Sequence, residues 1–189
     1  MTLFVDITDL MHYFRFHQEV SGLQRVVCEL ARQLVEQHKV CPVQLVAFSG
    51  AGHYVHVPDG ILSDGLRPTP REIARLINTK ARKRAKRPRW YTPPMLHSYI
   101  VSLFRSKPAA IAYSDRILVA GGSWGNINLL DHLETLRAGG VRVSQIVYDL
   151  IPHRTPQYCA DGLPAKFSAW LDRSPHYVSD YFTISEFVK

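Results

Sequence analysis

The sequence predicts an α/β fold: a Rossmann-like parallel sheet with helices on both faces, formed by a single domain over residues 1–189. Short apolar runs typical of buried strands alternate along the chain with longer segments that carry the apolar periodicity of a helix. The chain is 46% hydrophobic and 21% charged, which is the balance of a globular domain with a sizeable core. Strands that alternate with helices form βαβ units, and such units build parallel sheets.

The first half of the chain is expected to hold three strands and one long helix. Residues 3–6 form a short buried strand, a loop follows to Ser21, and a helix then runs to about residue 38. Residues 43–49 form a second strand and residues 53–58 a short strand at the sheet edge. The helix carries one apolar stripe that should face the core: Leu23, Val26, Val27, Leu30, Ala31, Leu34 and Val35.

The second half is expected to repeat the strand and helix alternation. A buried strand at residues 117–120 breaks at two glycines, and a helix over residues 126–138 closes at Gly139. A further buried strand begins at Val141 and ends near Asp149. A helix from Pro164 and a last strand over residues 181–185 complete the pattern. The carboxyl ends of such strands form the edge at which ligands bind.

The helix that begins at Ser21 offers a candidate anion site. Ser21 or Gly22 is the expected N-cap, and Gln24 and Arg25 fall in the first turn, where backbone N–H groups lack helical partners. The helix dipole disfavours a cation there unless an anion lies nearby. These residues therefore predict either a phosphate site or an ordinary cap followed by a solvated arginine.

Residues 59–110 look like an insertion that carries the excess charge. Residues 59–70 are rich in glycine and proline, and residues 71–87 have a helical pattern. Residues 80–89 hold seven basic and no acidic residues, which matches the whole formal charge of +7. This basic segment predicts binding to an anionic membrane surface rather than to nucleic acid, or else a solvated insertion. The predicted membrane-binding residues are Lys80, Arg82, Lys83, Arg84, Lys86, Arg87, Arg89 and Trp90.

Several classes of protein lack their sequence signals here. No apolar run approaches the roughly 20 residues of a membrane span, and no dinucleotide or Walker A glycine motif occurs. Cys28, Cys41 and Cys159 fit no metal pattern, and the nine histidines suggest no metal site. We therefore expect a cytoplasmic protein with free thiols and without a bound metal.

Gly121 to Gly125 match the G-x-S-x-G pattern of a hydrolase nucleophile between a strand and a helix. In that alternative Ser123 is the nucleophile, Asp149 orients the base, and His153 or His176 is the base. No oxyanion loop precedes the motif, and a five-residue pattern with two free positions is weakly specific. The other interpretation is a glycine turn that lets strand and helix pack closely.

The stretch from Val147 to Tyr158 offers a second candidate site. A buried strand delivers Asp149 to the binding edge, and His153 follows in the loop. A carboxylate and an imidazole at this position could act on a hydroxyl nucleophile. Asp149 could equally cap the turn.

Five segments in order resemble the N-terminal domain of family 4 glycosyltransferases, which are retaining enzymes of the two-domain GT-B architecture. They are FVDITDLMHYF, SGLQRVVCELARQL, ILVAGGSWGN, VRVSQIVYDLIPHRTPQY and YFTISEFVK. The resemblance implies that Ser21, Gly22, Gln24 and Arg25 face the diphosphate of a nucleotide-sugar donor. It implies no cofactor besides this co-substrate.

The resemblance also implies the acceptor side of the reaction. Trp124 would stack on a sugar ring beside Tyr148, and Asp149 and His153 would lie near the reacting centre. Many relatives carry histidine where this chain has Tyr148. The acceptor would be a polysaccharide or a lipid-linked glycan at the inner membrane face. Relatives continue into a second, nucleotide-sugar domain, so residues 1–189 alone are expected to be inactive, and a non-catalytic membrane-binding module is the remaining alternative.

Overall fold

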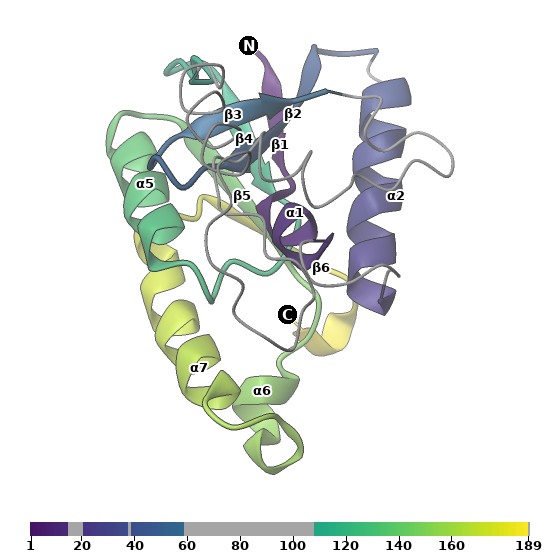
Figure 1. Cartoon of the computed structure of the whole chain (residues 1–189), viewed down its shortest axis with the longest axis vertical. Coiled ribbons are helices and arrows are strands. Elements are labelled where there is room, and N and C mark those ends of the chain that lie inside the picture. Colours follow the sequence, from purple (N-terminus) through teal and green to yellow (C-terminus); the bar gives the residue numbers. More distant parts are fainter. Residues whose placement is uncertain (15–20, 38, 59–107, 189) are drawn as a thin grey trace, which may run out of the picture.

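The computed structural model describes residues 1–14, 21–37, 39–58 and 108–188, and these form an α/β domain around one six-stranded sheet (Figure 1). The strand order is β3-β2-β1-β4-β5-β6. The strands are β1 (Leu3–Asp6), β2 (Val43–Phe48), β3 (Tyr54–Val57), β4 (Arg116–Val119), β5 (Arg142–Val147) and β6 (Asp180–Thr183). Five strands are parallel, and β3 pairs antiparallel with β2. The predicted Rossmann-like α/β class is confirmed.

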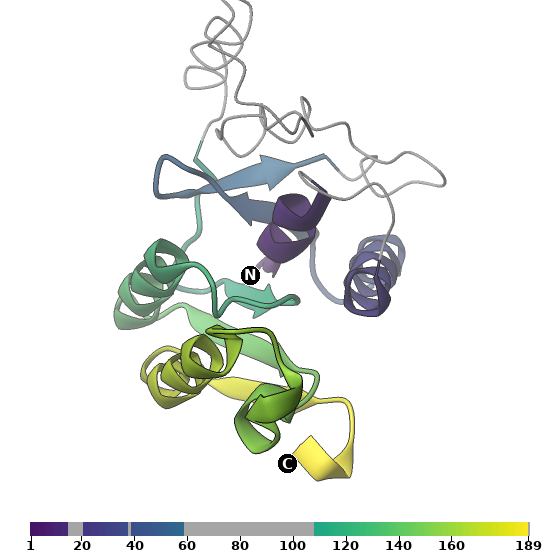
Figure 2. The same cartoon turned by 60° about the horizontal axis from the view of Figure 1, so that its bottom comes forward.

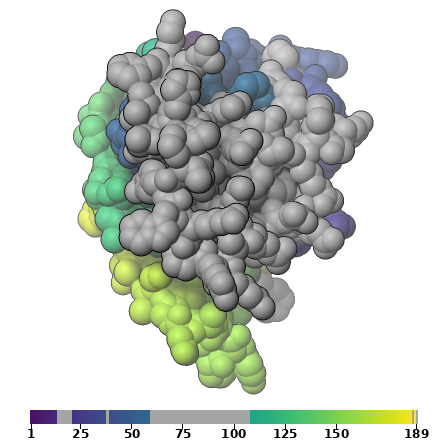
Figure 3. Space-filling model, in the orientation of Figure 1, coloured from purple at the N-terminus to yellow at the C-terminus, as the bar shows by residue number. Residues whose placement is uncertain are grey.

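Helices cover both faces of the sheet (Figure 2). One face carries α1 (Thr8–Phe14) and α2 (Gly22–Glu36), and the other carries α5 (Ile127–Ala138) and α7 (Leu163–Arg173). The short helix α6 (Ile151–Arg154) follows β5 and packs on α7. In the space-filling view the α6 and α7 segment extends at the lower end of the molecule (Figure 3).

Alternation along β1 divides the apolar core into two layers. Phe4 packs with the cluster of α5 and α7, which includes Leu133 and Trp170. The next residue, Val5, packs with the cluster of α1 and α2, which includes Met11 and Val27. Successive side chains of a strand point to opposite faces, so this central strand, covered on both sides, carries apolar residues on both faces before it ends at Asp6.

The region between β1 and α2 differs from the expectation, because residues 8–14 form α1 rather than a loop. Leu10 and Met11 are fully buried against the sheet. A helix of 7 residues is stabilised by this packing more than by its own propensity, so its sequence signal is weak.

The predicted apolar stripe of α2 is wrong at one residue, Val26. Val26 is 48% exposed, whereas Val27 and Ala31 are fully buried, and the polar Gln24 is buried at 6% exposure. The face of α2 that meets the sheet is therefore rotated toward Gln24 relative to the predicted stripe.

The basic segment and Trp90 lie outside the described residues, as do the expected helix over residues 71–87 and most of the insertion at 59–110. Membrane binding by this segment stays a prediction. Within the described ranges, no helix combines the length and apolar character that crossing a bilayer requires.

Candidate functional site

The sheet has a topological switch point between β1 and β4. From β1 the chain passes through α1 and α2 to β2 on one side, whereas from β4 it passes through α5 to β5 on the other. In open α/β sheets, ligands bind at the carboxyl ends of the strands where the strand order reverses in this way. We call the residues gathered there the switch-point site: Asp9, Gln24, Gly121, Gly122 and Tyr148.

Asp9 is the residue of this site that the sequence interpretation missed. It lies at the start of α1, is half-buried, and accepts a hydrogen bond from Gln24 Nε2 at 3.2 Å and another from the backbone N–H of Gly122. Burial raises the pKa of its carboxyl, and the two hydrogen bonds oppose that rise. A second aspartate three residues after the aspartate that ends β1 was the available sequence signal.

The glycine loop after β4 is shaped around Asp9. A Cβ atom on Gly121 would lie 2.6 Å from the Cβ of Asp9, and one on Gly122 would lie 2.5 Å from the ring of Trp124. Both distances are too short for any other residue type unless the neighbouring side chain or the backbone shifts. Glycine is therefore required here by close approach.

Gln145 holds the glycine loop in place through buried hydrogen bonds. Its side chain is almost fully buried, and Nε2 donates to the carbonyl oxygens of Val119 and Gly121, each at 3.3 Å. A buried amide that joins the end of β4 to the following loop resists displacement, because breaking these bonds leaves polar groups without partners.

Tyr148 contributes a protonated hydroxyl beside Asp9. Its hydroxyl donates to the carbonyl oxygen of Ala120 at 2.7 Å. Burial and, second, the negative charge of Asp9 raise the pKa of Tyr148 to about 12. Tyr148 is therefore neutral at physiological pH and is not a general base in this state.

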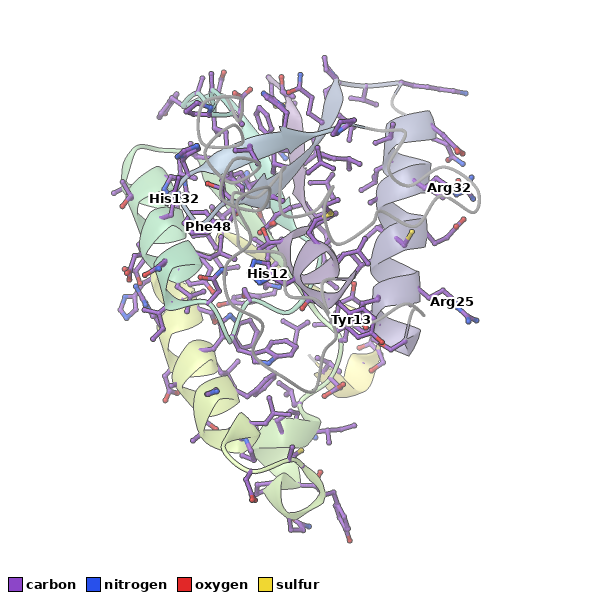
Figure 4. All side chains as sticks on the ribbon, in the orientation of Figure 1. His12, Tyr13, Arg25, Arg32, Phe48 and His132 are labelled. Atoms are coloured by element: carbon purple, nitrogen blue, oxygen red, sulfur yellow. The ribbon has the colours of Figure 1, made fainter. Side chains whose placement is uncertain are left out.

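No other part of the described chain covers the start of α2. Ser21 is the N-cap, its hydroxyl donates to Gln24 Oε1, and it makes no capping bond to the helix backbone. The first turn holds no acidic residue, and a Cβ on Gly22 would meet no atom of the described residues within 4 Å. Arg25 is exposed and points away from the body of the molecule at this end of α2 (Figure 4). Among the described residues it pairs with no carboxylate.

Asp6 lies next to this site but has a structural role. It is 2% exposed and accepts hydrogen bonds from the backbone N–H of Thr8 at 2.8 Å, from the Thr8 hydroxyl, and from the Tyr54 hydroxyl at 2.9 Å. Burial dominates and raises the pKa of its carboxyl to about 6. Asp6 ends β1 at the binding edge of the sheet, but its carboxylate joins β1 to α1 and β3.

Two other predicted site residues, Asp149 and His153, lie on the surface just before and on α6. Asp149 is exposed and its Oδ1 accepts from the backbone N–H of Ile151 at 2.9 Å, which forms a turn just before α6, whose N-cap is Leu150. His153 is exposed on α6, with Nδ1 3.2 Å from Ser168 Oγ on α7. A shared role of Asp149 and His153 in catalysis stays a prediction.

Trp124 is half-buried in an aromatic cluster. Its ring centroid lies 5.4 Å from that of Phe167 and 5.9 Å from that of Trp170. These contacts anchor the glycine loop to α7. Stacking of Trp124 on a sugar ring stays a prediction.

Ser123 does not have the surroundings of a hydrolytic nucleophile. It is 1% exposed, and its hydroxyl lies 3.2 Å from Gln145 Oε1, to which it donates. The His153 ring is engaged with Ser168 instead. A nucleophile must reach its substrate and hydrogen-bond to its base, so this geometry favours the packing interpretation of the glycine turn.

A separate groove of about 420 Å³ lies between the β2–β3 hairpin and α5. Its lining includes Phe48, Ser49, Asp131 and His132. The His132 ring packs against Phe48, with centroids 5.3 Å apart (Figure 4). Burial, and then the neighbouring His53, lower the pKa of His132. In the part of the chain that the structure describes, no group of three or more metal-ligating side chains gathers.

Comparisons of the chain with protein families, with curated proteins and with solved structures found no match. The geometry of the site therefore carries the functional argument.

Proposed function

We propose that this chain is the N-terminal, acceptor-side domain of a retaining glycosyltransferase that moves a sugar from a nucleotide-sugar to a polysaccharide or glycolipid acceptor. The observation that supports it best is the half-buried carboxylate of Asp9 beside the open first turn of α2, at the switch point of the sheet. This arrangement puts a group suited to hydroxyls next to a group suited to an anion.

In this proposal the donor diphosphate lies at the first turn of α2. The turn carries backbone N–H groups without helical partners and no acidic side chain. Gly22 leaves space for a phosphate oxygen to approach the backbone, and Arg25 adds a positive charge. Ser21 and Gln24 shape the turn through their mutual hydrogen bond.

The acceptor side would use the loops that follow β4 and β5. Trp124 lies in the loop after β4, Tyr148 and Asp149 lie in the loop after β5, and His153 lies on α6, which follows that loop. These residues are at the same edge of the sheet as the start of α2. Asp149 is exposed and thus accessible to an acceptor hydroxyl. The hydrolase alternative has the weaker support, because the Ser123 hydroxyl is buried.

The proposal is tested by sugar transfer from a panel of radiolabelled nucleotide-sugars, with membranes of the source cell as acceptor. The protein is expressed from its complete reading frame. We expect Arg25→Ala to lower kcat/KM by about 10- to 100-fold, since it removes a charge-assisted hydrogen bond to phosphate. The matched control is Arg137→Ala, an exposed arginine in the last turn of α5.

Two results would count against this function. One is the absence of both transfer and donor hydrolysis with every nucleotide-sugar tested. The other is transfer that Arg25→Ala and Arg137→Ala reduce equally, because the effect would then be independent of the α2 site.

A further inference from the structure

We propose that the carboxylate of Asp9 binds a hydroxyl group of a sugar ring, and that this residue separates the neutral part of the ligand from its phosphates. This inference rests on the proposed function and deepens it. It assigns a binding residue that is not among the site residues expected from the sequence.

The first reason is that Asp9 holds unused acceptor capacity. A carboxylate offers about four acceptor positions. Among the described residues, Asp9 receives only the Gln24 side-chain amide and the Gly122 backbone amide, and it pairs with no lysine or arginine. The nearby Tyr148 hydroxyl is occupied by Ala120. Because Asp9 is half-buried rather than enclosed, a ligand can supply the missing donors.

The second reason is that the negative charge of the Asp9 carboxylate disfavours a phosphate and favours a neutral hydroxyl. A phosphate placed against Asp9 would bring two negative charges together without a cation from the described residues to offset them, and partial burial strengthens that repulsion. A sugar hydroxyl donates a proton to the carboxylate and carries no net charge, and such O–H to carboxylate bonds are short and strong. The anion belongs instead at Gly22 and Arg25, on the exposed side of the first turn.

The third reason is that the surroundings hold Asp9 in one place. Gln24 is 6% exposed and links the N-cap Ser21 to Asp9 through its side-chain amide. The missing Cβ of Gly121 leaves room for the Cβ of Asp9, and Gln145 fixes that loop. A group ordered before its ligand arrives loses less conformational entropy on binding.

The first experiment follows the site directly by NMR of the full chain. The probes are the methyl α-glycosides of glucose, galactose and mannose as neutral ligands, and inorganic pyrophosphate as the anion. We expect at least one glycoside to shift the Asp9 carboxyl carbon and the Gln24 side-chain amide in a saturable way. Pyrophosphate should shift the Gly22 and Arg25 signals instead.

The variant Asp9→Asn keeps the shape of the side chain and removes its charge. We expect it to weaken the glycoside about 10- to 100-fold, the range for a hydrogen bond to a charged group, and to leave pyrophosphate affinity unchanged or increased. Asp172→Asn, at an exposed position on α7, is the matched control. The wild-type carbon shift remains decisive even if Asp9→Asn unfolds.

Kinetic assays of Asp9→Asn distinguish whether the bound hydroxyl belongs to the transferred sugar or to the acceptor. A rise in KM for donor hydrolysis by Asp9→Asn assigns it to the transferred sugar, whereas a loss confined to transfer assigns it to the acceptor. Unchanged glycoside affinity in Asp9→Asn, or no glycoside-dependent shift at Asp9 in the wild type, overturns the inference. If Asp9-dependent glycoside binding persists without any transfer activity, the inference stands and the proposed function fails.

Discussion

Two aspartates three residues apart, Asp6 and Asp9, have different roles because their surroundings differ. Asp6 is enclosed and receives three hydrogen bonds from Thr8 and Tyr54. Asp9 is half-buried and, from the described residues, receives two hydrogen bonds, both from neutral groups. The same side chain is therefore a structural link in one case and a proposed ligand-binding group in the other.

The raised pKa of Asp6 makes the stability of the protein depend on pH. In the folded state this carboxyl titrates at about 6, against an ordinary value of 3.8. Between these values the folded state binds more protons than the unfolded state, so the free energy of unfolding falls as pH rises. The stabilisation is complete below about pH 4 and is lost above about pH 6, and it amounts to about 3 kcal/mol.

Urea unfolding of wild type and Asp6→Asn at several pH values between 4 and 7.5 measures this effect. We expect the wild type to lose stability across this window relative to Asp6→Asn, since the amide does not titrate. Asp9 contributes with the same sign in both proteins, because burial also raises its pKa. A constant difference between the two proteins across the window would contradict the assignment.

At the scale of elements, the loop between β4 and α5 connects packing to the site. Gly121 faces Asp9, and Gly122 faces Trp124, which is anchored on α7. The loop therefore has one side against α1 and the other against the aromatic cluster.

The substitution Gly121→Ala is expected to destabilise the protein by about 1–3 kcal/mol, because a Cβ 2.6 Å from that of Asp9 forces the backbone apart. Gly125→Ala is the control in the same loop, since its Cβ would meet no atom within 4 Å. Thermal and urea unfolding of both variants test this. Equal stability of the two variants would show that the loop yields to the extra atom without cost.

At the scale of the whole molecule, the helices on the two faces of the sheet pack in two separate apolar clusters. On one face α5 and α7 are joined by Arg173, which donates to Glu134 Oε1 and to Asp131 Oδ1, each at 2.6 Å. These bonds raise the pKa of Arg173 and lower that of Glu134. The cluster is partly exposed, so its contribution is screened by solvent.

Replacing this arginine by methionine should therefore cost only about 0.5–1 kcal/mol, and less in 1 M NaCl than in dilute buffer. Urea unfolding of Arg173→Met at both salt concentrations measures the effect, with Arg137→Met on α5 as the control. A loss of several kcal/mol that salt leaves unchanged would mean that the methylene stem of Arg173, rather than its charge, joins the helices.

The candidate site could be predicted from the sequence only in part. The open start of α2, with Gly22 and Arg25, follows from local signals, because a helix N-terminus is defined by its own residues. Asp9, by contrast, is positioned by packing against a glycine loop more than 110 residues later in the chain. No local pattern reports such a contact.

The sequence by itself determined the α/β class, the parallel strands and the approximate bounds of β1, β2, β4 and α5, because strand and helix periodicities are local properties. Only the tertiary structure decided the strand order, the helix α1, the burial of Gln24 in place of Val26, and the separate roles of Asp6 and Asp9. Each of these depends on which distant segment packs against a residue. The burial of a side chain and its hydrogen-bond partners are set by that packing, so they cannot be predicted from the local sequence alone.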